Sequence, residues 1–277
     1  MMTEESIARA ARLVYISMPF GKLDAHMRAL VKEHRLNLEI GISHHALDAH
    51  APGEFRAVAA EIADAGISTT VHAPFQELFP GAPDRLVREA ARARLDAAFG
   101  LAPLFRPASV VMHLNFEYRR FGFVHRDWLA HTAAEIDRYA ELAAAMNALL
   151  CLENVYEESP DIFGEVFAKI SAKNVRHCLD VGHLAAFSKI GIAEWLSGAG
   201  HFVGQFHLHD NDGSGDRHAP LGEGSVDFAA VKDFIAGMNA VPLVTLEPHS
   251  EPDIWKTLAG FTVLGFPEVL EKLPRVP

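Results

Sequence analysis

The stretch VRHCLDVGHLAAFSKIGIAEWLSGAGHFVGQFHL, residues 175–208, holds two apolar, strand-like runs separated by a helical pattern. The runs are VRHCLDV (175–181) and FVGQFHL (202–208), and the helical pattern spans 184–198. Both runs are mostly apolar rather than strictly alternating, as expected of parallel strands that are covered by helices. The stretch therefore predicts one strand–helix–strand unit of an α/β protein.

The same unit recurs along the whole chain. The other strand candidates are RLVYISM (12–18), LNLEIGI (36–42), STTVHA (68–73), SVVMHL (109–114), LLCLENV (149–155) and PLVTLEP (242–248). The other helical patterns lie at 22–34, 54–65, 84–105 with Asp84 as a cap, 127–147, 161–172, 227–239 and 253–274. Eight such units predict a (β/α)₈ TIM barrel that forms a single domain over 1–277, with 1–10 as an N-terminal extension. A doubly wound open sheet is the competing layout, but no Gly-x-Gly-x-x-Gly follows the first strand.

Composition and charge argue against a membrane protein, a secreted protein and a nucleic-acid-binding protein. The 277 residues contain no apolar run near the length of ~20 that spans a bilayer, and the N-terminus has acidic residues where a secretory signal carries lysines. We therefore expect a soluble, cytoplasmic protein that does not bind a membrane. The net charge of −11 argues against a nucleic-acid surface, although a local basic patch on an acidic protein keeps that partner open. A homo-oligomer is compatible with the sequence.

Two cysteines occur, and both lie in apolar strand candidates. Cys151 and Cys178 are therefore interpreted as buried free thiols of the core, not as a disulfide or a catalytic nucleophile. Residues two apart in a strand share a face, so each cysteine points the same way as the acidic residue that follows it two positions later. No Cys-x-x-Cys exists, which argues against a thiolate zinc site.

Six consecutive strand candidates end in side chains that can bind a metal. In barrel enzymes the carboxyl ends of the strands build the active site. Several carboxylates at one rim would repel each other unless a divalent cation lay among them, and a mixed set of histidines and carboxylates suits Zn²⁺, Mn²⁺, Fe²⁺ or Co²⁺ better than Ca²⁺. Each residue alone has a structural explanation, such as Asp180 as a helix cap, and it is the joint pattern that predicts a metal site. The residues are His72, His113, Glu153, Asp180 with His183, His207 with Asp216 and His218, and Glu247.

Six segments in order resemble the xylose-isomerase-like TIM-barrel superfamily, which includes sugar isomerases, sugar epimerases and endonuclease IV. They are VHAPF (71–75), LENVYE (152–157), CLDVGH (178–183), FHLHDNDG (206–213), DRHAPLGEG (216–224) and LEPHS (246–250). The ketose epimerases hold one divalent metal (Zn, Mn, Mg or Co), and the resemblance implies the ligands Glu153, Asp180, His207 and Glu247. In those epimerases the metal-binding histidine lies three residues before an acidic residue. This spacing implies His207, three residues before Asp210, and not His209. The resemblance also implies substrate binding by His183 and Arg217.

Endonuclease IV resembles the chain at more positions, because its three-zinc site uses further ligands. These match His72, His113, His183, Asp216 and His218, so that all nine ligand types of that site are present and up to three ions are implied. Two segments depart from that enzyme. Val155-Tyr156-Glu157 replaces a Thr-Ala-Gly, and Ala73-Pro74-Phe75-Gln76 differs from the segment that helps to open DNA, which argues against DNA repair.

The leading interpretation is a metal-dependent isomerase or epimerase of a small sugar or sugar phosphate. Glu153 and Glu247 would pass a proton through an enediolate, and His183 would orient a substrate hydroxyl. The first alternative is a multinuclear zinc phosphodiesterase related to endonuclease IV, and dehydration of a cyclic hydroxy acid is a variant of the same proton chemistry. The second alternative is a sugar-binding barrel without catalysis. In each case we expect 221–224 to lock the 206–224 loop before a helix that begins near Asp227.

Overall fold

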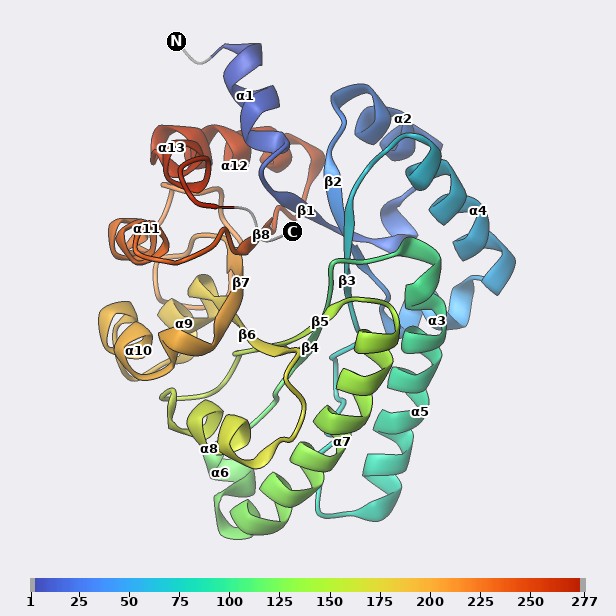
Figure 1. The fold of residues 1–277 in the computed structure, drawn as a ribbon, viewed down its shortest axis with the longest axis vertical. Helices are drawn as coiled ribbons and strands as arrows, with labels where there is room; N and C mark the ends of the chain where they lie inside the picture. Colours follow the sequence, from blue (N-terminus) through green and yellow to red (C-terminus); the bar gives the residue numbers. More distant parts are fainter. Residues whose placement is uncertain (1–2, 275–277) are drawn as a thin grey trace.

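Eight parallel strands close a barrel in which each strand pairs with its sequence neighbours and β1 pairs with β8 (Figure 1). The computed structural model describes residues 3–274. All eight predicted strands are confirmed, with small shifts at their ends, and so is the single-domain TIM barrel. The strands are β1 (Tyr15–Pro19), β2 (Asn37–Gly41), β3 (Thr69–His72), β4 (Ser109–His113), β5 (Leu149–Glu153), β6 (Val175–Asp180), β7 (Val203–Leu208) and β8 (Leu243–Leu246).

Helices surround the barrel on its outside (Figure 1). They are α1 (Glu4–Ala11), α2 (Ala25–His34), α3 (His44–Ala49), α4 (Pro52–Asp64), α5 (Arg85–Leu101), α6 (Tyr118–Phe121), α7 (His125–Ala145), α8 (Asp161–Lys169), α9 (Val181–Phe187), α10 (Ile192–Ala199), α11 (Phe228–Ala236), α12 (Glu251–Val263) and α13 (Phe266–Leu270). None of the helices within 3–274 is both long and apolar enough to cross a membrane.

Caps and backbone breaks explain where the helices differ from the prediction. The Asp84 carboxylate accepts from Leu86 N at 2.7 Å, so the predicted cap of α5 is confirmed. The range 184–198 splits into α9 and α10, because Asp180 caps α9 directly after β6 and the chain is extended again at Ser188. The range 253–274 splits at Gly265, whose φ of +80° ends the helical path.

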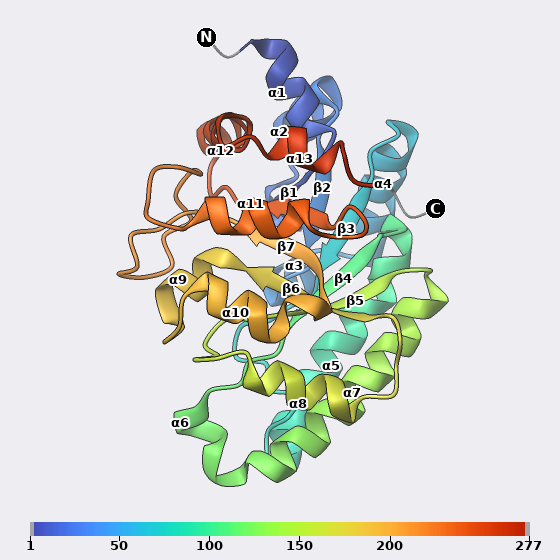
Figure 2. The ribbon, with the colours of Figure 1, turned by 60° about the vertical axis from the view of Figure 1, so that its left-hand side comes forward.

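The N-terminal segment is part of the outer layer of helices. The extension predicted for 1–10 begins outside the described residues, and its remainder forms α1. Figure 2 shows α1 beside α12 and α13. Arg9 pairs with Glu268 and Glu271, and Ala10 and Ala11 are buried. Residues 4–11 therefore pack against the last helices of the barrel instead of extending away from it.

The lumen below the rim is narrow and mostly uncharged. Val111, Cys151 and Cys178 pack together there and are fully buried, and both cysteines are free. Burial raises the pKa of Cys151 to about 12 and that of Cys178 well above its ordinary value. The interpretation of both residues as core thiols is confirmed.

The outward face of β6 carries a buried, neutral histidine. His177 Nδ1 donates to the Leu152 carbonyl at 2.9 Å, and Trp195 Nε1 donates to His177 Nε2 at 3.1 Å. Burial lowers the pKa of His177 from 6.5 to about 4, because the charged form has no water and no acidic partner in contact. The His177 side chain is therefore neutral at pH 7.

This histidine makes folding sensitive to acid. Because its folded pKa lies below its unfolded pKa, the stabilisation is complete above pH 6.5 and is lost as the pH falls towards 4. At about 1.4 kcal/mol per pKa unit, the loss is about 3 kcal/mol. We expect His177→Gln to remove this part of the dependence in urea unfolding at pH 7 and pH 4.5, and the exposed His201→Gln to keep it. Equal pH dependence in His177→Gln and the wild type would contradict the prediction.

Candidate metal centre

Strand register brings the predicted site residues to one rim of the barrel. His113 lies opposite Glu153 and Asp180 opposite His207, while Glu247 continues β8 by donating its backbone N–H to Leu208 O at 3.2 Å. The side chains form two adjoining groups. The inner cluster is His72, His113, Glu153, Asp180, His207 and Glu247, and the outer cluster is His183, His209, Asp216 and His218.

Glu153 lies at the centre of the inner cluster. Its Oε2 is 3.0 Å from His72 Nε2, 3.4 Å from His113 Nε2 and 3.3 Å from His207 Nδ1. Its Oε1 faces the outer cluster, 3.2 Å from His183 Nδ1. Burial disfavours the charge, but the surrounding histidines outweigh burial and hold the pKa of Glu153 well below its ordinary value. Both carboxylate oxygens of an ionised Glu153 are therefore engaged on opposite sides.

Three histidines of the clusters have the orientation that metal-binding histidines adopt in proteins. The Nδ1–H of each has a backbone carbonyl to donate to: Ala73 O at 2.8 Å from His72, Asn154 O at 3.0 Å from His183, and Glu247 O at 3.3 Å from His218. Because a carbonyl can only accept, the proton is assigned to Nδ1. Each Nε2 is left with its lone pair towards the carboxylates.

His207 has the opposite orientation and depends on a residue that the sequence analysis missed. Its Nε2 lies 3.1 Å from Glu39 Oε1, and its Nδ1 lies 3.1 Å from Glu247 Oε1. Glu39 on β2 is fully buried, and its Oε2 accepts from Thr70 Oγ1 at 2.9 Å, Gln205 Nε2 at 2.8 Å and Thr245 Oγ1 at 3.1 Å. A lone carboxylate in the apolar run LNLEIGI was the signal that could have found it.

Glu39 is expected to control the metal affinity of His207 without touching the metal. In Glu39→Gln the amide nitrogen can face His207 Nε2, which favours the tautomer with its proton on Nδ1, the atom that faces Glu247. We expect zinc affinity to fall by about 10- to 100-fold, measured by competition with a coloured chelator. Thr70→Val is the matched control, because it removes a hydrogen bond to the same carboxylate but keeps its charge. Equal affinities in the two variants would show that Glu39 only packs the lumen.

Several buried polar atoms of the site lack the partners that buried atoms normally have. Within residues 3–274, Asp180 Oδ2, His207 Nδ1 and both ring nitrogens of His209 make no hydrogen bond. Three of these atoms face other candidate ligands: Asp180 Oδ2 lies 3.5 Å from His183, His207 Nδ1 lies 3.1 Å from Glu247, and His209 Nε2 lies 3.1 Å from Asp180. Nitrogen and carboxylate donors without hydrogen bonds, close together and shielded from water, fit bound divalent cations such as Zn²⁺, Mn²⁺ or Co²⁺.

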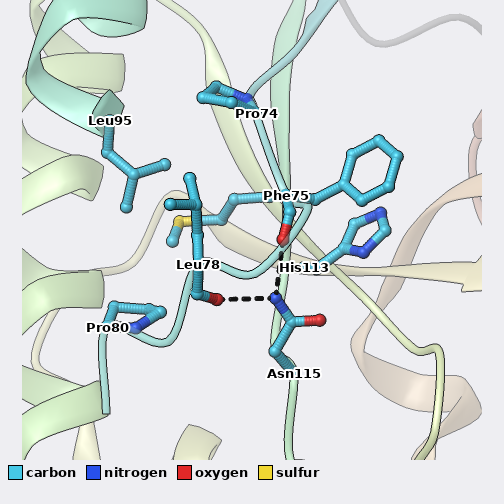
Figure 3. Close-up of a pocket in the computed structure, with 8 residues that line it drawn as sticks. Pro74, Phe75, Leu78, Pro80, Leu95, His113 and Asn115 are labelled. Carbon is cyan, nitrogen blue, oxygen red and sulfur yellow. Dashed lines mark hydrogen bonds between the residues drawn. The ribbon is translucent and has the colours of Figure 1, made fainter. Parts of the chain in front are cut away.

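The loop after β3 covers one edge of the inner cluster. Asn115 Nδ2 donates to Leu78 O at 2.8 Å and to Phe75 O at 3.3 Å, which fixes the loop against β4 (Figure 3). Phe75 then stacks on the His113 ring with centroids 4.2 Å apart (Figure 3). The stack limits rotation of His113, so its Nε2 stays directed at Glu153.

The predicted lock of the 206–224 loop is confirmed, and its centre is Asp210. The buried Asp210 carboxylate accepts from the N–H groups of Asn211, Gly222, Gly224 and Val226 at 2.9, 2.9, 2.9 and 3.1 Å. Its backbone also pairs with Ala219 in both directions. A Cβ on Gly224 would lie 2.3 Å from Asp210 Oδ1, so only glycine permits this approach. The loop therefore presents Asp216 and His218 from a fixed frame, and Asp227 caps α11 as expected.

Asp210→Asn is expected to release this loop. An amide turns one acceptor oxygen into a donor that faces backbone N–H groups, and hydrogen bonds to a charged group contribute about 1.5–3 kcal/mol each. We expect a loss of about 3 kcal/mol in the free energy of unfolding and faster protease cleavage within 211–225. Asp212→Asn on the exposed part of the same loop should change neither measurement. Identical behaviour of the two variants would contradict the role of Asp210.

Nine of the ten predicted site residues lie in the two clusters. Arg217 does not join them, because its guanidinium pairs with Asp212 at 3.0 Å and its side chain is 62% exposed. Its role in substrate binding stays a prediction. Besides Glu39, His209 was not predicted as a site residue, because the motif spacing favours His207, but its side chain lies in the outer cluster.

The family of the chain follows from a match over most of its length. A family model described as xylose isomerase-like TIM barrel matches residues 18–263. The chain belongs to this family. An uncharacterized protein, MJ1311 of Methanocaldococcus jannaschii, is 25% identical over 202 residues, 69% of this chain and 68% of that protein.

Several solved structures share the fold at low sequence identity. The TTHB071 protein from Thermus thermophilus, soaked with ZnCl₂, matches with a TM-score of 0.77 and 22% identity, over 91% of this chain and 98% of that chain. D-psicose 3-epimerase with D-tagatose from Clostridium cellulolyticum H10 matches with a TM-score of 0.71 and 15% identity, over 93% and 99%. Sugar epimerases are thus among the structural neighbours of the barrel.

Proposed function

We propose that the chain is a hydrolase of small phosphate esters that uses more than one divalent metal ion. The observation that supports this most is the number of candidate ligands: Glu153 Oε2 faces His72, His113 and His207 at 3.0–3.4 Å, and the outer cluster supplies a second set. A site for a single ion needs only four ligands and gives no reason for His72 and His113 to lie against the same carboxylate. The inner and outer clusters together offer more ligands than a single ion can take.

Divalent ions in these clusters would neutralise the charge of a phosphate ester and make a water molecule acidic enough to attack phosphorus at neutral pH. The reaction breaks the P–O bond to the alcohol and forms a P–O bond to water. Glu247 takes the proton of the attacking water and returns it to the departing alkoxide. Glu247 is the carboxylate we assign to this transfer, because its Oε2 approaches histidine nitrogens only at 3.6 and 4.0 Å, whereas each oxygen of Glu153 has one within 3.2 Å.

Substrate enters from the side of the outer cluster. The Asp180 and His207 side chains are sealed from solvent, whereas the Asp216 side chain is 31% exposed. The net charge of −11 disfavours long nucleic acids, whose binding needs a basic surface. The proposed substrates are therefore small esters, sugar phosphates among them.

The test combines metal content with hydrolysis. Protein purified without chelator or metal-affinity resin, then saturated with zinc and desalted, should contain two or three zinc ions per chain by elemental mass spectrometry. His72→Asn and His113→Asn should lower this number and abolish hydrolysis of bis(4-nitrophenyl) phosphate, while the exposed His45→Asn should change neither. A single ion that is unaffected by both changes would overturn the proposal.

Epimerisation of a small sugar is the second candidate, supported by one feature of the inner cluster. Glu153 Oε2 and Glu247 Oε1 approach His207 Nδ1 at 3.3 and 3.1 Å from different strands, as a proton transfer between two carboxylates needs. D-psicose 3-epimerase shares the fold. In D₂O such an enzyme would exchange a carbon-bound hydrogen of a ketose or its phosphate for deuterium, which NMR detects. Hydrolysis alone leaves those hydrogens in place.

A further inference from the structure

His209 is a buried histidine to which neither candidate reaction assigns a role. It follows β7, two residues after His207, and so points towards the same rim. It is 1% exposed, and neither ring nitrogen makes a hydrogen bond within the described part of the chain. A buried imidazole with two unbonded nitrogens is costly, so a further partner is expected.

The packing around the His209 ring fixes its orientation. One neighbour is the His218 ring, parallel to within 5° with centroids 3.8 Å apart. Another is Gly182, where a Cβ would lie 2.0 Å from His209 Cε1. His218 stacks in turn on His249 at 4.1 Å. Only a glycine at 182 leaves room for the ring, which is therefore placed by the fold and not by its own hydrogen bonds.

In this orientation the ring edge faces the carboxylates. His209 Nε2 lies 3.1 Å from Asp180 Oδ1 and 3.6 Å from Asp216 Oδ1. His183 Nε2 and His218 Nε2 approach the same Asp216 carboxylate at 3.3 and 3.1 Å. One ligand atom from each of the four side chains of the outer cluster lies within 4.8 Å of all the others.

We propose that His209 is a ligand of the ion in the outer cluster and completes a set of three imidazoles and one carboxylate. This inference rests on the proposed multinuclear site. Four protein ligands fill the tetrahedral coordination that zinc adopts in structural sites, whereas three leave one position open. The outer ion is then closed to substrate and is held more tightly than the inner ions. It fastens the 206–224 loop to α9, and the reaction takes place at the inner cluster.

The test uses Zn²⁺ and Co²⁺ alone, without substrate. His209→Asn is compared with His249→Asn, which shortens the same ring stack from its other end but removes no ligand. In zinc competition with a coloured chelator, the wild type and His249→Asn should hold one ion distinctly more tightly than the rest. His209→Asn should weaken that ion by about 100-fold or more. The visible absorption of tetrahedral Co²⁺ should appear first on titration and be lost only in His209→Asn.

Gly182→Ala provides a second variant that keeps the imidazole. The added methyl group displaces the His209 ring, so it should also weaken the tight ion, with circular dichroism like that of the wild type. If both His209→Asn and Gly182→Ala keep the tight ion and its Co²⁺ absorption, the assignment of His209 is wrong and the multinuclear site stands. If the wild type never holds more than one ion under saturating zinc, the proposed function itself is wrong, and this inference with it.

Discussion

We expect Glu153→Gln to lower the proposed hydrolysis by about 10²–10³-fold or more and to leave at most one ion bound per chain. The expected size is that of losing a charged group which stabilises a transition state. The amide is neutral, and its nitrogen must face either His72 or His183, whose nitrogens lie 3.0 and 3.2 Å from the present oxygens. The first orientation turns an amide NH₂ group, which cannot bind a metal, towards the inner histidines, and the second sets it against the protonated Nδ1 of His183. Initial rates with an activated phosphodiester and elemental analysis of the desalted protein measure the two effects.

The matched control for this prediction is Glu158→Gln. Glu158 follows the same strand, but it pairs with Lys189 outside the clusters. It should keep both its ions and its rate. Circular dichroism checks that Glu153→Gln is folded. Wild-type turnover and wild-type metal content in Glu153→Gln would contradict the role of Glu153 in a site for more than one ion.

Removal of metal is expected to lower the thermal midpoint by about 10 °C or more. A ligand at 1,000 times its dissociation constant stabilises the folded state by about 4 kcal/mol. For a protein of this size each kcal/mol shifts the midpoint by about 2–4 °C. Without ions, the carboxylates of Glu153, Asp180 and Glu247 are held together only by histidines that they share. Scanning calorimetry before and after dialysis against a strong chelator measures the change.

Restoring zinc should return the midpoint to its original value, and Mg²⁺ should not, because imidazole ligands suit zinc and not magnesium. Glu153→Gln, expected to hold fewer ions, should lose less stability on dialysis than the wild type. A midpoint that is the same with and without chelator would mean that the clusters are stable through their histidine–carboxylate pairs alone.

The sequence was sufficient for the strands and for the residues at their carboxyl ends. An apolar run such as LLCLENV, in a chain that alternates such runs with helical patterns, predicts a buried strand, and the barrel then places Glu153 at the rim with the other strand ends. Periodicity did not predict that 184–198 divides into two helices. Asp180, which the motif assigns to the metal, also caps α9, so this helix starts directly after β6 and ends at Phe187.

Partners of buried side chains were the part that the sequence could not supply. The contact between Glu39 Oε1 and His207 Nε2 forms only when the barrel brings β2 and β7 to the same lumen. Their spacing along the chain does not predict this contact. The motif spacing points to one histidine, His207, and so gives no reason to select His209. The stack on His218 and the close approach to Gly182, which orient the His209 ring, are contacts of the folded chain that the sequence does not show. The locking of the 206–224 loop could be predicted from its glycines, but not that Asp210 holds it.

The polar contacts of Glu39 join the candidate metal ligands at the rim to the inside wall of the barrel. Side chains from three different strands, Thr70, Gln205 and Thr245, meet on one oxygen of the Glu39 carboxylate, and its other oxygen faces His207. A substitution at any of these lumen positions is therefore expected to change the position of His207 as well as the packing of the barrel.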